Sequence, residues 1–233
     1  MTGFLALLRK ETKALFSSPI AYALIAVFLL IMGFSFAATL FLTKSTSLIQ
    51  VFFQASVLFL LIIPVITMRL FAEERRNGTL ELLLTSPVHE LQVVLAKFIA
   101  SFGVIVAMLA PTLVYAVILA LYSTPDFGPL YSGYIGLLAM GSGLLAVGLA
   151  VSAFSANQIV AATISLGVFL AMWMVDSLAY MLPDPFDQLV TNASLLAHFT
   201  PFATGALYLS DLGFFLSLTL FGLFLSVRAL ERR

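Results

Sequence analysis

The residues best suited to chemistry stand in one charged stretch, residues 69–97, which reads RLFAEERRNGTLELLLTSPVHELQVVLAK. Two glutamates and two arginines follow one another at 73–76, and a further glutamate stands at position 81. Carboxylates and guanidinium groups at this density form ion pairs, within the chain or with a partner. The stretch is too charged to lie in hydrocarbon, so it predicts an aqueous segment between apolar helices.

Helix signals divide this stretch into two pieces. Asn77 and Gly78 break the first helix, Thr79 caps a second, and Pro87 ends it. One interpretation is a solvated helix with internal ion pairs, each worth less than about 1 kcal/mol. The other is a docking element that fits a groove on a soluble partner and passes the partner's movement to the flanking spans. The charge pattern by itself leaves both open. The residues assigned to docking are Arg69, Glu73, Glu74, Arg75, Arg76, Gly78, Thr79 and Glu81.

Other kinds of site find little support in the sequence. The chain has no cysteine, which excludes disulfides and thiolate chemistry. It has no G-x-x-x-x-G-K-[ST] motif to bind nucleotide phosphates, and His89 and His198 lack metal-ligand spacing. Ser142 lies between two glycines in an apolar segment without a histidine to act as its base. We therefore predict no catalytic residue, no metal site and no cofactor in this chain.

The composition indicates which elements position the charged stretch. Of the 233 residues, 62% are hydrophobic and 9% are charged, a balance typical of a protein dissolved in a bilayer. A spanning helix needs about 20 mostly apolar residues. The sequence predicts an all-α integral membrane protein, with residues 1–233 forming a single domain. Its six expected transmembrane helices lie at about residues 20–42, 48–68, 98–122, 130–154, 159–182 and 205–228.

Two further segments are expected at the membrane surface. Residues 1–18 predict an interfacial helix that ends before Pro19. Its apolar side is expected to carry Phe4, Leu5, Leu8 and Leu15, and its other side Arg9, Lys10 and Lys13. Residues 186–204 contain aromatic residues and no basic residue, which favours an interfacial or re-entrant segment before the last span.

The distribution of positive charge predicts the orientation. With six spans, ten of the eleven lysine and arginine residues fall on one side of the membrane or at its boundary, and only Lys44 lies opposite. Positive residues in short loops are retained on the cytoplasmic side. We therefore expect a multi-pass protein with both termini in the cytoplasm.

Small residues and two acidic residues mark specific positions within the spans. Gly143, Gly148 and Ser152 permit close approach of helices and predict tight packing or a homodimer seam. Asp176 and Asp211 lie near the outer ends of the fifth and sixth spans. An acidic group at membrane depth faces a cavity or a partner, or reaches water at the interface, and both interpretations remain open.

The string MRLFAEERRNGTLELLLTSPVHELQVVLAKF, residues 68–98, resembles the signature cytoplasmic segment of ABC-2 type permeases. In that segment, an arginine and glutamates precede G-T-x-E-x-L-L-x-[ST]-x-P. Residues 9–22 are similar to the family's interfacial helix and first-span entry. Residues 198–233 are similar to the last-span region of the gliding-motility-type branch.

This resemblance implies a function and a set of partners. The chain would be the permease subunit of an ATP-driven exporter in the bacterial cytoplasmic (inner) membrane. A second permease chain, identical or related, would pair with it, and an accessory subunit and membrane lipid are further partners. A separate P-loop ATPase would bind ATP and Mg at the charged loop, and no nucleic acid is involved. The rival hypothesis is a non-transporting scaffold or assembly factor that uses the same loop to recruit a cytoplasmic complex.

Overall fold

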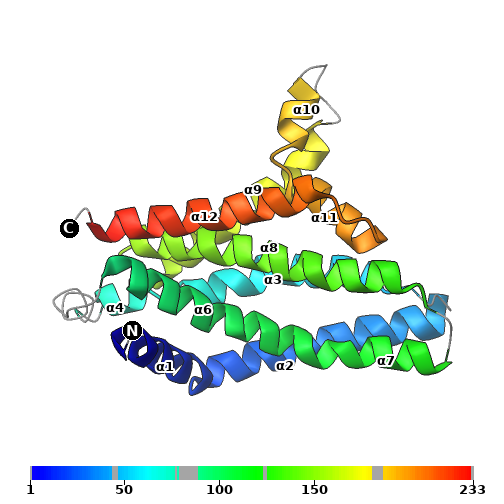
Figure 1. Ribbon diagram of the computed structural model, residues 1–233, viewed down its shortest axis with the longest axis horizontal. Helices are drawn as coiled ribbons and strands as arrows, with labels where there is room; N and C mark the ends of the chain where they lie inside the picture. Colours follow the sequence, from blue (N-terminus) through cyan, green and yellow to red (C-terminus); the bar gives the residue numbers. More distant parts are fainter. Residues whose placement is uncertain are drawn as a thin grey trace.

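The computed structural model describes residues 2–43, 47–76, 78, 89–122, 125–179 and 186–231, and the regular elements in these ranges are all helical. Figure 1 shows most of the helices lying along one long axis, with α10 projecting from the side of the bundle. The α-helices are α1 (Thr2–Phe16), α2 (Pro19–Ala38), α3 (Ile49–Thr67), α4 (Ala72–Arg76), α6 (Glu90–Leu109), α7 (Leu113–Tyr122), α8 (Phe127–Phe154), α9 (Gln158–Ala179), α10 (Phe186–Thr191), α11 (Leu195–Thr204) and α12 (Leu209–Glu231).

Within the described ranges, six helical segments are long and apolar enough to cross a membrane. Three of them join neighbouring helical elements. Helix α2 continues into a π-helix at Thr39–Thr43, a 3₁₀ turn at Pro111 links α6 to α7, and a short turn links α3 to α4. The predicted all-α, six-span fold class is therefore confirmed. The segments are Pro19–Leu42, Ile49–Arg76, Glu90–Tyr122, Phe127–Phe154, Gln158–Ser177 and Leu209–Glu231.

Two helices begin at residues that differ from the starts of the expected spans. The third span was expected to begin at residue 98 after an aqueous loop ending at Lys97, but α6 begins at Glu90 and Lys97 is buried within it. The helix can include this lysine because carboxylates neutralise its charge. The last span was expected to begin at Gly205, but this residue has φ of 105° and ends α11, so α12 begins at Leu209. A left-handed glycine is a common helix terminator.

Helix α8 forms the centre of the bundle and packs on α3, α11 and α12. Its glycines allow close contact between helices. A Cβ atom added to Gly148 would lie 2.5 Å from Thr67 Oγ1, and one added to Gly143 would lie 3.0 Å from Leu218 Cδ2. Both glycines and Ser152 are buried against helices of the same chain. Tight packing within the chain therefore accounts for these positions, and a homodimer seam would need another face.

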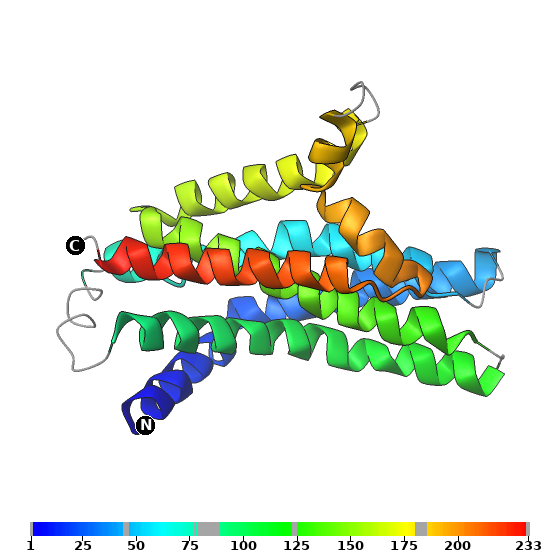
Figure 2. The same cartoon turned by 45° about the horizontal axis from the view of Figure 1, so that its top comes forward.

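The segment before the last span consists of two short helices that return the chain to the bundle. Ser194 caps α11 by accepting a hydrogen bond from the Ala197 backbone N–H at 3.1 Å. Ser132 of α8 donates a hydrogen bond to the Phe202 carbonyl at 2.6 Å, which holds α11 on the bundle. Figure 2 shows α9 leaning away from the other long helices toward this pair.

Candidate functional site

Three helices meet at the charged end of the bundle, where Figure 1 shows α1, α4 and both chain termini. Lys97 of α6 lies between two carboxylates from distant parts of the chain. Its Nζ atom is 3.1 Å from Glu11 Oε2 on α1 and 2.8 Å from Glu74 Oε1 on α4. The Lys97 side chain is 2% exposed. We call Glu11, Glu74 and Lys97 the ionic cluster.

Helical periodicity places these side chains on inward faces. Val93, one turn before Lys97, is buried, and so is Leu7, one turn before Glu11. Side chains four residues apart share a helix face. Lys97 and Glu11 therefore point into the protein, as Val93 and Leu7 do. The Phe71 ring adds a cation–π contact, with its centroid 5.3 Å from Lys97 Nζ. A buried cation with two carboxylates and an aromatic ring needs no water for its stabilisation.

Helix α4 is also fixed to the end of α8. The Ser152 hydroxyl accepts hydrogen bonds from the backbone N–H groups of Phe71 and Ala72, each at 3.2 Å, and so caps α4. The Arg75 guanidinium donates to the Ala153 carbonyl, and to the Ser155 carbonyl at 3.0 Å. A cation at a helix C-terminus satisfies its last carbonyls and its negative dipole. The short helix is thus joined directly to α6 and α8, and through Lys97 to α1.

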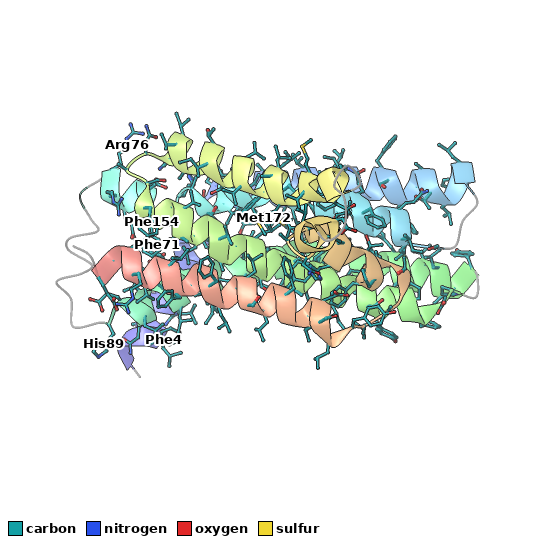
Figure 3. The ribbon with its side chains drawn as sticks, turned by 90° about the horizontal axis from the view of Figure 1, so that it is seen from above. Phe4, Phe71, Arg76, His89, Phe154 and Met172 are labelled. Atoms are coloured by element: carbon teal, nitrogen blue, oxygen red, sulfur yellow. The ribbon has the colours of Figure 1, made fainter. Side chains whose placement is uncertain are left out.

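The structure separates the residues that the sequence assigned to docking. Arg69, Glu74 and Arg75 point into the protein, with Arg69 donating to Ser18 Oγ at 3.2 Å. Glu73 is partly exposed and lies 3.5 Å from Arg69 Nε. Arg76 and Gly78 are exposed, and Gly78 has φ of 68°. Figure 3 shows Arg76 and His89 at the same end of the bundle. Thr79 and Glu81 lie outside the described residues.

Sequence reasoning missed Glu11 and Lys97 as site residues. Glu11 was considered only as a member of a surface helix, and Lys97 as the end of a loop. On α1, Leu5 of the expected apolar side is 59% exposed, whereas Glu11 is 5% exposed. The spacing of Leu7 and Glu11 is the one sequence signal that places this carboxylate on a buried face.

Asp211 has a partner within the protein. Its Oδ1 lies 2.8 Å from His198 Nδ1, and the residue is 7% exposed. The imidazole stacks on Phe214 with ring centroids 4.0 Å apart. This pairing joins α11 to α12, so Asp211 does not extend to water, whereas Asp176 on α9 is partly exposed.

Metal ligation has no support in the part of the chain that the structure describes, where no three His, Cys, Asp or Glu side chains gather. The ionic cluster instead joins α1, α4 and α6 through ion pairs. Six apolar helices and one braced charged end define a polytopic helical membrane protein.

The family of this protein follows from a comparison with known families. The family described as ABC-2 family transporter protein matches residues 43–227. The chain belongs to this family, whose members are membrane subunits of ABC transporters. The matched part covers α3 to α12 except for the last four residues of α12, and α1, which supplies Glu11, precedes it. No curated protein matches the chain.

Proposed function

We propose that this chain is the permease subunit of an ATP-driven exporter and that it is moved by a separate ATPase bound at the charged end. The observation that supports this most directly is the bracing of α4. This helix follows the second span and contacts α6 and α8 directly through charged or polar side chains. It is linked to α1 through Lys97, which also binds Glu11. A force applied beside α4 would therefore reach three long elements at once.

Exposed charges beside this brace supply the docking surface. Arg76 is exposed at the end of α4 and Glu73 is partly exposed one turn earlier. Complementary charges at an interface steer association and set its register. ATP and Mg belong to the partner in this proposal. The assignment to the gliding-motility-type branch rests on the resemblance of residues 198–233.

A second permease chain completes the proposed transporter. Helix α9 exposes large apolar side chains along its length, including Ile159 at 73% and Met174 at 60%. Such a face requires lipid or another apolar helix. The proposed location is the bacterial cytoplasmic membrane, and 186–204 is the proposed re-entrant segment on its outer side.

Charge reversal tests the docking surface. We expect Arg76→Glu to weaken binding of the ATPase by roughly 30-fold or more, because loss of a desolvated charge pair costs about 2 kcal/mol or more. The measurement is the amount of P-loop ATPase that copurifies with the full chain from its native membranes. Arg9→Glu is the matched control, since Arg9 is exposed on α1 at the same end. Equal recovery of ATPase with both variants would contradict the docking proposal.

ATP-driven transport in reconstituted vesicles separates an exporter from a scaffold.

The proposed orientation has its own test. The chain lacks cysteine, so single cysteines can be labelled against a silent background. Cysteines at positions 5, 78 and 231 are expected to react only from the cytoplasmic side, and those at 126 and 190 only from outside. Membrane-impermeant maleimide, applied to intact cells and to inverted vesicles, measures this. Reaction of position 231 in intact cells would require an odd number of spans.

A further inference from the structure

A cavity of about 440 Å³ lies beside the ionic cluster, between α1, α2, α3 and α6. This volume is within the range of about 300–1,000 Å³ typical of small-molecule sites. We propose that the cavity binds the head group of a zwitterionic phospholipid that carries a primary ammonium. The inference rests on the proposed function only in placing this end of the bundle at the membrane surface.

The lining of the cavity changes from charged to apolar along the bundle. Glu11, Glu74 and Lys97 line the end near α4, whereas Leu24 and Val104 line it further along α2 and α6. Lys97 and Val104 are seven residues apart, which is about 10 Å along a helix. A ligand that fits this gradient has a charged head and an apolar tail, as a lipid does.

The charges that line the cavity favour a cation. Three carboxylates, those of Glu11, Glu73 and Glu74, face it together with only two cations, Arg69 and Lys97. Lys97 is shared between Glu11 and Glu74, and Arg69 lies beside Glu73. Among the residues that line the cavity, carboxylates therefore outnumber cations by one.

One carboxylate oxygen of this lining lacks a hydrogen bond. Glu11 Oε1 is buried and has no hydrogen-bond partner among the described residues, and its closest cation is Lys10, with Nζ at 3.6 Å and a side chain that is 61% exposed. A buried oxygen without a donor costs about 1–3 kcal/mol or more. A primary ammonium supplies three N–H donors and one positive charge, so it satisfies both requirements. A quaternary ammonium has the charge but no N–H donor.

The opposite group of a zwitterionic head also finds a partner. Arg69 lines the same cavity, and its Nε atom is buried without a hydrogen-bond partner in the described structure. A guanidinium group suits phosphate oxygens because its donors form a planar fork. In this proposal, the lipid phosphate binds beside Ser18 and Arg69, between the carboxylates and the apolar part of the cavity.

Membrane lipid is the source that the surroundings favour. Helix α2 supplies Ile20, Ala21 and Leu24 to the cavity. The same helix exposes Tyr22 at 59%, Val27 at 52% and Leu30 at 73% on its other faces. A helix that is apolar on its exposed faces lies against hydrocarbon, so a lipid beside α2 has direct access.

The test measures lipid retained by the purified full chain. The chain is equilibrated with nanodiscs containing equal phosphatidylethanolamine, phosphatidylcholine and phosphatidylglycerol, and bound lipid is counted by native mass spectrometry. We expect phosphatidylethanolamine to be retained at least about tenfold over the other two. Glu11→Gln is expected to abolish this preference, because it removes the charge while keeping the side-chain shape. Glu231→Gln is the matched control, as Glu231 is exposed at the same end.

A second variant covers the case in which Glu11→Gln disrupts folding through the ionic cluster. Val65→Phe fills the apolar part of the cavity and leaves every charged residue unchanged; it is expected to lose the bound lipid at an unchanged melting temperature. Equal retention of the three lipids by the wild type, or full retention by Val65→Phe, would overturn the proposal. The assay contains no ATPase, so lipid binding without ATPase copurification would contradict the proposed function and leave this site intact.

Discussion

Lys97→Met is expected to lower the free energy of unfolding by about 3–5 kcal/mol, because it leaves two carboxylates without their cation in a buried site. Methionine has a similar volume to the lysine stem, so a cavity is not the cause. The loss arises from Glu11 and Glu74, which lie 3.1 and 2.8 Å from Lys97 Nζ. Unfolding of the purified chain in mixed micelles, followed by increasing denaturing detergent, measures the difference.

Two comparisons separate this effect from a general loss of positive charge. Lys13→Met changes an exposed lysine on α1 and is expected to alter stability by less than about 0.5 kcal/mol. The triple variant Lys97→Met, Glu11→Gln, Glu74→Gln removes all three charges together and is expected to recover part of the loss. If Lys97→Met is as stable as Lys13→Met, the ionic cluster does not stabilise the fold.

The same variant links stability to the proposed function. Without Lys97, α4 keeps its cap at Ser152 and the Arg75 bonds to α8, but it loses its ionic contact with α6. Movement of the charged loop would then reach α8 and not the third span. An ATPase that still binds but no longer drives transport is the expected result in reconstituted vesicles.

The spans were predictable from the sequence because their length and apolar content are set by the bilayer. The third span was predicted as one crossing despite Pro111 inside it. In the structure, a 3₁₀ turn at Pro111 joins α6 to α7 within one segment. The sequence placed the start of the third span at residue 98 because a lysine interrupts the apolar run there, whereas α6 begins at Glu90 and includes Lys97. Its neutralisation depends on Glu11, which is 86 residues away in the sequence, and such pairings come from tertiary structure.

The faces of the surface helix were harder to predict than its existence. Leu5 is exposed and Glu11 buried on α1, which reverses the usual preference in a water-soluble protein. In a membrane protein, lipid and protein interior are both apolar, so hydrophobicity does not tell one face from the other. The docking residues show a similar limit, because charge density did not reveal that Arg75 points inward to carbonyl groups of residues 153 and 155.

Gly222→Ala is expected to lower the free energy of unfolding by about 1–3 kcal/mol, with Gly222→Val preventing accumulation of folded protein. A Cβ atom at Gly222 of α12 would lie 2.5 Å from the carbonyl carbon of Ala146 and 2.7 Å from its oxygen. These are backbone atoms of the central helix α8, so no side chain can rotate to make room. The helices must separate, and dispersion contacts along the whole α8 and α12 interface weaken.

A glycine on the same helix provides the control for this prediction. A Cβ atom at Gly213 would meet nothing within 4 Å, so Gly213→Ala adds a better helix former without a clash and is expected to be neutral or stabilising by up to about 1 kcal/mol. Melting temperature and the monodisperse fraction on size exclusion, measured for both alanine variants, give the comparison. Since the two substitutions are chemically identical, any difference between them reports the distance between α12 and α8. In the structure, a Cβ atom at Gly222 would lie 2.5 Å from the Ala146 backbone. Equal melting temperatures of the two variants would mean that α12 and α8 are farther apart than this distance implies.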